Sequence, residues 1–268
     1  MKTLLSFIKR RPGVQKFLRN LRFWSSLVGV DVFRMASLGG LPAVVREYAA
    51  LKRQNKATTQ PCIHDRFEES GVASGHYFHQ DLLVARRVFA RQPERHVDVA
   101  SRVETFVAHV AAFRPIEVFD VRPLSVRIPN ISFRQCDFMN LPADLHEYAD
   151  SVSCLHALEH FGLGRYGDPI DINGHLKGFD SLYKVLKPGG MLYLSFPVGE
   201  VERIDFNAHR VFSIGTVLRW LEGRFELIAF SYVDDRGDLH ENIDRAGIDA
   251  QRSFGLHYGC GIFELKKL

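Results

Sequence analysis

Apolar and polar residues alternate along residues 94–233 in blocks that predict strands and helices in turn. Short apolar runs predict the strands, and apolar residues at every third or fourth position predict the helices between them, beginning with 103–110. The predicted strands are 96–100, 116–120, 131–137, 152–155, 191–199, 224–233 and 261–268. Because helices separate several of these strands, we expect an α/β fold with a doubly wound, mostly parallel sheet.

The N-terminal third follows a different pattern. A helix is predicted from Leu41, a polar and glycine-containing connection over 56–75, and a second helix from about Tyr77. The chain therefore divides into an N-terminal helical extension, 1–90, and an α/β domain, 91–268.

The first 22 residues carry seven lysines and arginines and no acidic residue, with leucines and phenylalanines between them. Two interpretations stay open for this segment. It is either a basic amphipathic segment that touches anionic lipid through residues 1–24, or an ordinary helix packed on the core.

Composition narrows the class of protein. A hydrophobic fraction of 46% in 268 residues supports a real core, and no uncharged apolar run approaches the ~20 residues of a membrane span. The net charge of +4 does not require a nucleic-acid partner. Four separated cysteines without a C-x-x-C pair suggest reduced core thiols and a cytoplasmic protein, peripheral at the inner membrane face if the basic segment binds lipid.

Candidate ligand-binding residues gather where the predicted strands end. Asp98 lies in the first strand, Asp120 ends the second and Asp137 ends the third. Parallel strands bring their carboxyl ends to one edge of a sheet, so these carboxylates are expected to border one ligand. Asp120 suits a ribose diol, which can donate two hydroxyl hydrogen bonds to it, and Phe138 could stack on a purine ring.

The turn after the first strand contains no glycine. Ala100 and Ser101 are small, whereas Arg102 must point outward if a cofactor is to approach the backbone. Ser101 and Glu104 have the spacing of a capping box at the start of the next helix. Glu104 is either that cap or a partner for a cofactor's ammonium group.

The fourth strand ends in a polar cluster, "SCLHALEHF" (153–161), and the segment after it leads to a helix and "LKPGG". This order, with Asp98, Asp120 and the stretch "DFMNLP" (137–142), resembles class I S-adenosylmethionine (SAM) dependent methyltransferases over about 94–233. The string "LHALEHFGLGRYGDPID" (155–171) also resembles an uncharacterised methyltransferase-allied family associated with bacterial surface-polysaccharide gene clusters. The glycine-less first turn departs from the methyltransferase pattern.

The resemblance implies a Rossmann-like, seven-stranded sheet with antiparallel edge strands and a SAM cofactor. It also implies O-methylation of a saccharide or its lipid-linked precursor. The residues to which it assigns cofactor binding are Asp98, Ala100, Ser101, Asp120, Asp137, Phe138 and His156.

Methyl transfer to a sugar hydroxyl requires a base. Histidine suits this role because its pKa of ~6.5 lies near working pH. His160 is the first candidate and His209 the second, and Asp168 or Asp171 could orient either imidazole or bind sugar hydroxyls. The alternatives are that His160 only begins a helix and that Asp168 only initiates a turn.

A metal site is not expected from the sequence. The acidic loop 234–241 has no familiar ligand spacing, and the pair His156 and His160 lacks the glutamate position of a zinc protease. The absence of Gly-x-Gly-x-x-Gly after the first strand argues against a nicotinamide dehydrogenase. Two alternative functions remain, a degenerate non-catalytic binding or partner module and an enzyme of another nucleotide such as a sugar nucleotide.

Overall fold

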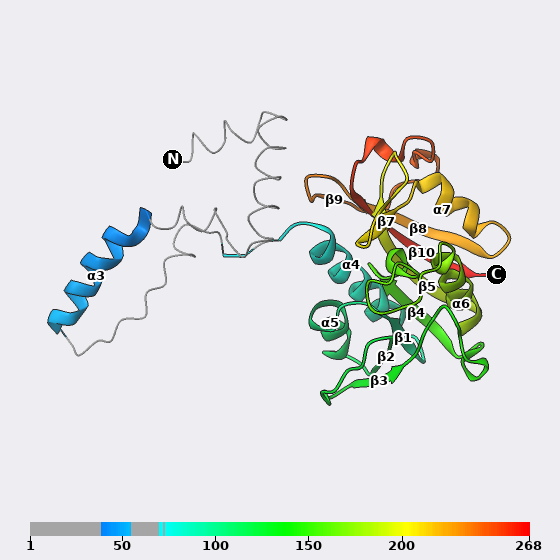
Figure 1. Cartoon of the computed structure of the whole chain (residues 1–268), viewed down its shortest axis with the longest axis horizontal. Coiled ribbons are helices and arrows are strands. Elements are labelled where there is room, and N and C mark those ends of the chain that lie inside the picture. Colours follow the sequence, from blue (N-terminus) through cyan, green and yellow to red (C-terminus); the bar gives the residue numbers. More distant parts are fainter. Residues whose placement is uncertain (1–38, 55–69, 72) are drawn as a thin grey trace. The chain divides into compact units, whose positions relative to one another are not determined.

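The computed structural model describes residues 39–54, 70–71 and 73–268. The predicted lipid contact through residues 1–24 therefore lies outside the described residues. The chain divides into two compact units between Val72 and Ala73. In the first unit, the helix predicted from Leu41 is present as α3 (Leu41–Gln54; Figure 1). The sequence of this helix is amphipathic.

An eight-stranded sheet organises the second unit (Figure 1). Its order is β3-β2-β1-β4-β5-β10-β8-β9. The strands are β1 (His96–Val99), β2 (Ile116–Asp120), β3 (Ile131–Gln135), β4 (Ala149–Leu155), β5 (Leu186–Val198), β8 (Phe225–Val233), β9 (Leu239–His240) and β10 (Gly259–Lys267). The first five strands in this order, from β3 through β2, β1 and β4 to β5, pair in parallel. Strand β10 lies between β5 and β8 and is antiparallel to both.

The predicted fold class, a Rossmann-like and mostly parallel sheet with antiparallel strands at one edge, is confirmed. The strand number differs from the expected seven because the acidic loop folds back on β8 and adds the short β9. A separate hairpin, β6 (Arg203–Asp205) with β7 (His209–Val211), also forms where the sequence pattern showed no strand.

Helices cover both faces of the sheet (Figure 1). On one face lie α4 (His76–Arg91), the π-helical turn η2 (Val103–Val107) and α5 (Ala108–Ala111), which share a core with Tyr193 and Ile262. The other face carries α6 (Gly174–Val185) and α7 (Ile214–Leu221). Short 3-10 turns complete the unit at η3 (Ala143–Leu145), η4 (Leu158–His160), η5 (Arg245–Gly247) and η6 (Ser253–Gly255).

Helix α4 packs on the sheet through apolar side chains that include Leu83, Val84 and Val88. The compact unit begins at Ala73. The structure thus places this helix with the α/β unit, although the sequence pattern had assigned residues up to 90 to the N-terminal extension.

The central strands are buried on both faces, as parallel strands covered by helices must be. Their apolar residues, such as Val97 and Val152, face one core cluster. On the opposite face, His96, Asp98 and Ser153 are buried and must find hydrogen-bond partners there. This polar row runs toward the carboxyl edge of the sheet, where the turns after β1 and β4 meet.

Candidate functional site

Two connected cavities lie at the carboxyl edge of the parallel strands. The narrow one encloses about 50 Å³ and is mainly apolar, with Phe119, Phe138 and Phe161 among its walls. The wide one encloses about 740 Å³ and is lined largely by polar and aromatic side chains. Residues shared by both walls are Ala100, Asp120, Arg122, His156, His160 and Tyr166. This is the position at which open α/β sheets bind ligands.

The turn after β1 is built on Asp98. Its fully buried carboxylate accepts hydrogen bonds from the Ser101 hydroxyl at 2.6 Å, the Ser101 backbone N–H at 3.0 Å and the Ser153 hydroxyl at 2.6 Å. Burial raises the pKa of Asp98 to about 7, although these hydrogen bonds oppose the shift. Asp98 therefore lies beneath the cavities and shapes the turn rather than bordering the hollow with Asp120 and Asp137 as predicted.

Ser101 does not form the predicted capping box. Its hydroxyl bonds to Asp98 and accepts the Leu155 N–H at 3.0 Å, so the buried network takes the hydrogen bond that a helix cap needs. The helix instead begins after Arg102 without a side-chain cap. Glu104 pairs with Arg102, and both side chains are exposed at the wall of the wide cavity. Arg102 points away from the narrow cavity, lying over the ring of Tyr77.

The glycine-less turn keeps a glycine-like backbone. Ala100 has a φ of 58°, in the left-handed region that side chains disfavour, and its N–H donates to the Phe119 carbonyl at 2.8 Å. Ala100 lies in the wall of both cavities and is small enough to leave the narrow cavity open. Its position fits the cofactor-binding role assigned from sequence.

Asp120 borders both cavities but already has a partner. Arg122 donates to its two oxygens at 3.0 and 2.6 Å, and the Arg122 backbone N–H donates to Oδ1 at 2.8 Å. The guanidinium also lies 4.3 Å from the centre of the Tyr166 ring. A ribose diol would have to displace this guanidinium to reach the carboxylate.

Asp137 and Phe138 line the narrow cavity, as predicted for the residues beside a purine. The Asp137 carboxylate holds its own turn, accepting from the Met139 N–H at 2.8 Å and the Asn140 amide at 2.7 Å. Phe138 is nearly buried and packs at 5.7 Å from the Phe119 ring centre, which fixes one apolar wall.

His156 and Glu159 form a buried pair after β4. Nδ1 of His156 donates to Glu159 Oε1 at 2.8 Å, because a carboxylate can only accept. Burial alone would lower the pKa of His156, but the Cys260 sulfur and the Glu159 carboxylate raise it well above its ordinary value. Burial alone would raise the pKa of Glu159, and His156 keeps it below its ordinary value. His156 also takes a φ of 51°, which turns the chain out of the sheet.

His160 has the arrangement of a general base. Its Nδ1 lies 2.6 Å from the Ala208 carbonyl, which only accepts, so Nδ1 carries the proton and Nε2 is left to take one. Burial lowers the pKa of His160, which keeps the imidazole neutral at working pH. His160 lies in the walls of both cavities.

The other predicted catalytic residues have different surroundings. His209 lines the wide cavity, pairs with Asp205 at 3.3 Å and has a pKa lowered by burial. Asp168 lines the narrow cavity, but its oxygens accept backbone N–H groups of its own loop, including that of Gly162 at 2.8 Å. Asp171 is in neither wall and pairs with Lys177 at 2.6 Å. The structure thus brings His160 and His209 to one cavity and leaves Asp171 outside it.

Several cavity residues carried no recognisable signal in the sequence. Arg122 closes over Asp120, while Tyr77 and Tyr258 bring aromatic rings to the wide cavity from α4 and the start of β10. Only Arg122, two residues beyond a predicted ligand-binding carboxylate, had a local clue. Tyr258 is positioned by Asp235 of the acidic loop, whose carboxylate accepts its N–H at 2.7 Å.

Comparison with known proteins supports the fold. The family model described as Caenorhabditis protein of unknown function, DUF268, matches residues 125–256. No curated protein matches the chain in sequence. The 4+2 cyclase SpnF is similar in structure, with 17% identity, a TM-score of 0.51, and coverage of 70% of this chain and 80% of that chain.

Two methyltransferases solved with S-adenosylhomocysteine are also similar. One is the N-methyltransferase NodS from Bradyrhizobium japonicum WM9, with 14% identity, a TM-score of 0.48, and coverage of 72% of this chain and 88% of that chain. The other is 1,6-didemethyltoxoflavin-N1-methyltransferase from Burkholderia thailandensis, with 14% identity, a TM-score of 0.48, and coverage of 70% and 78%. The similarity to SpnF supports the α/β fold alone. The resemblance to class I methyltransferases in function, the SAM cofactor and the polysaccharide association stay predictions. Within the described part of the chain, no helix combines the length and apolar character needed to cross a bilayer.

Proposed function

We propose that the chain is a SAM-dependent methyltransferase that transfers a methyl group to a hydroxyl of a saccharide in cell-surface polysaccharide biosynthesis. The observation that supports this most is the position of His160. It lies in the shared wall of a narrow apolar cavity and a wide polar one, with the tautomer that a base requires. A base there can take the proton of a hydroxyl in the wide cavity.

The residues of the narrow cavity suit an adenosyl group. Phe138 offers an apolar wall for a purine, and Asp120 offers two oxygens for ribose hydroxyls once Arg122 moves aside. Ala100 allows close approach of the backbone, as its left-handed conformation replaces that of a glycine. When bound, SAM supplies an electrophilic methyl group, and positioning the acceptor beside it can lower the barrier by about 7–11 kcal/mol.

The wide cavity suits a saccharide. Tyr77, Tyr166 and Tyr258 present aromatic rings with polar tips, and His209 and Arg165 add hydrogen-bonding groups. Such walls can pack against the C–H faces of a sugar ring and bond its hydroxyls. The polysaccharide context itself rests on the resemblance of 155–171 to the uncharacterised family.

One observation favours a second candidate, a non-catalytic module. Arg122 already satisfies both oxygens of Asp120, as if the protein side chain had replaced a ligand. If this ion pair does not open, the fold binds no adenosyl group and serves as a partner or sugar-binding subunit.

Asp120→Ala tests the cofactor site. We expect the variant to bind S-adenosylhomocysteine roughly 10²–10⁴-fold more weakly than the original chain, because each hydrogen bond to a charged group contributes ~1.5–3 kcal/mol and two are lost. Isothermal titration calorimetry measures this directly.

The matched control for that titration is Asp144→Ala. Asp144 is an exposed acid paired with Arg134 at 2.7 Å, and neither residue lines the two cavities. Its loss should leave the affinity unchanged. If the original chain shows no binding at millimolar S-adenosylhomocysteine, the proposed cofactor site is wrong and the non-catalytic alternative is favoured, unless the chain binds a nucleotide sugar instead.

A further inference from the structure

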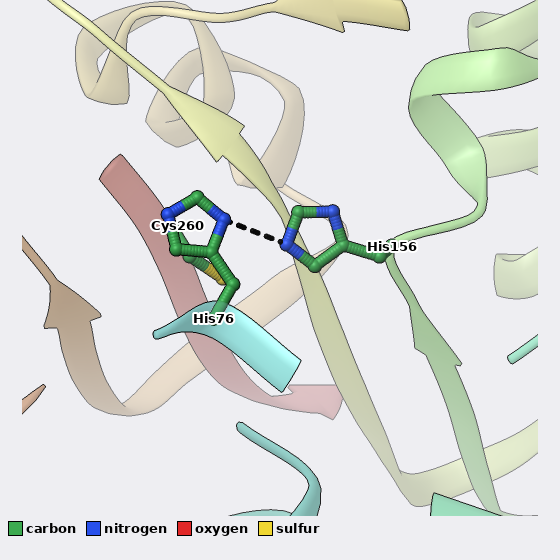
Figure 2. Close-up of side chains that lie close together, drawn as sticks. All are labelled: His76, His156 and Cys260. Carbon is green, nitrogen blue, oxygen red and sulfur yellow. Dashed lines mark hydrogen bonds between the residues drawn. The ribbon is translucent and has the colours of Figure 1, made fainter. Parts of the chain in front are cut away.

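Three side chains that are remote in sequence meet beside the wide cavity. His76 is the first residue of α4, His156 follows β4, and Cys260 lies in β10 (Figure 2). Figure 2 shows the two imidazole rings joined by their nitrogen contact, with the Cys260 side chain behind that of His76. Nδ1 of His76 is 3.1 Å from Nε2 of His156. One ring nitrogen of each histidine and the Cys260 sulfur all lie within 4.8 Å of one another.

These distances are close to those that a tetrahedral metal ion imposes. Zinc bonds of ~2.0–2.1 Å to nitrogen and ~2.3 Å to sulfur place neighbouring ligand atoms about 3.3–3.7 Å apart. The two imidazole nitrogens, 3.1 Å apart, already have nearly this separation. The Cys260 sulfur, within 4.8 Å of a ring nitrogen of each histidine, is near enough to complete the set if its side chain moves closer. The two rings are stacked with their planes 15° from parallel, so one of them must turn for both nitrogens to point at an ion. His76, at the first residue of its helix and only half-buried, is the one with room to do so.

The surroundings of the cluster match those of metal-binding histidines. Glu159 accepts from Nδ1 of His156 at 2.8 Å, which directs Nε2 of the same ring toward His76. A carboxylate behind a ligating imidazole is the usual arrangement that fixes its orientation and raises its basicity. The other oxygen of Glu159 is buried and has no hydrogen-bond partner among the described residues. The buried carboxylate is therefore only partly satisfied by the imidazole, and a cation close by would stabilise it.

The burial and the chemistry of the three side chains indicate which metal they would bind. His156 and Cys260 are buried, and the Cys260 thiol otherwise finds only weak partners, the Gln80 side-chain oxygen at 3.6 Å and the Gly261 carbonyl at 3.7 Å. Two imidazoles and a thiolate are borderline or soft donors, which suit Zn²⁺ and disfavour Mg²⁺ and Ca²⁺.

We propose that His76 Nδ1, His156 Nε2 and Cys260 Sγ bind one Zn²⁺ ion, with the fourth position left for water or a ligand. The ion would tie the start of α4 to the end of β4 and the start of β10, and so hold one wall of the wide cavity. No local pattern predicts this site, because the three residues are far apart along the chain. The proposal does not depend on methyl transfer.

Cobalt substitution tests the ligand set in the full chain. Co²⁺ added to metal-free protein is expected to give a thiolate-to-cobalt charge-transfer band and strong visible bands of a tetrahedral site, and one equivalent of Zn²⁺ should abolish both. Cys260→Ser should lose the charge-transfer band, whereas Cys154→Ser, which removes an equally buried thiol outside the cluster, should keep it. Absence of the band in the original chain, or its survival in Cys260→Ser, would overturn the proposal.

Thermal unfolding shows whether each variant folds and, at the same time, whether it binds Zn²⁺. Zn²⁺ should raise the Tm of the original chain and of Cys154→Ser, and a chelator should reverse the shift, because the ion binds only the folded site. His76→Ala should fold and show no such shift. Glu159→Gln should weaken Zn²⁺ binding by about 10–100-fold in a competition titration. If Zn²⁺ shifts the Tm of His76→Ala as much as that of the original chain, His76 is not a zinc ligand. The contact between the two rings is then only a hydrogen bond.

Discussion

His160→Ala is expected to lower methyl transfer by about 10²–10⁴-fold while leaving the affinity for S-adenosylhomocysteine nearly unchanged, because general base catalysis contributes a factor of this size. Nδ1 of His160 is held by the Ala208 carbonyl, so the removed ring is the one prepared to accept a proton. Transfer of a tritiated methyl group from SAM to lipid-linked saccharide extracts measures the rate, and calorimetry measures the affinity.

The pH profile separates a base from a structural side chain. A base must be unprotonated, and burial lowers the pKa of His160 below its ordinary ~6.5. The rate should therefore fall only as the pH drops below this value, and His160→Ala should lose that limb. His146→Ala, an exposed histidine outside both cavities, should match the original chain. If His209→Ala loses more activity than His160→Ala, the second candidate is the base.

Much of the fold could be predicted because strands and helices have local signatures. Apolar runs such as 152–155 mark buried strands wherever they occur, and their order with the helices restricts the sheet topology. The short β9 and the β6–β7 hairpin escaped prediction because they depend on which loops fold back, not on apolar periodicity. The capping box failed for a similar reason, since a buried carboxylate competed for the Ser101 hydroxyl.

The candidate site was predictable only where its residues follow strands. Ala100, Asp120 and His156 could be located because the ends of parallel strands meet at one edge. No local pattern could show that Arg122 would close over Asp120, or that His76 and Cys260 would meet His156. These contacts arise from packing between elements that are distant in sequence. Asp171 was expected near the histidines but pairs with Lys177 outside both cavities, because residue spacing does not reveal which way a loop side chain points.

Asp98→Ala is expected to destabilise the α/β unit by about 3 kcal/mol, the largest stability effect of the changes considered. Removing the carboxylate leaves two hydroxyls and one backbone N–H without their acceptor in a buried site, and each such loss costs ~1–3 kcal/mol. The relief of a buried charge offsets part of that cost. For a unit of this size, about 3 kcal/mol corresponds to a fall in Tm of roughly 6–12 °C.

Calorimetry of Asp98→Ala beside Asp144→Ala checks this, because the exposed ion pair between Asp144 and Arg134 contributes little to stability. The sign of the pH dependence gives a second check. The folded pKa of Asp98 is about 7, above its unfolded value of 3.8, so the folded protein binds the extra proton between these limits. The contribution of Asp98 to stability therefore declines as pH rises from about 4 to 7. Asp98→Asn does not titrate, so its Tm should rise relative to that of the original chain as the pH increases from about 4 to 7. If the difference in Tm between the two proteins is constant over this range, the pKa of Asp98 is not raised in the folded protein.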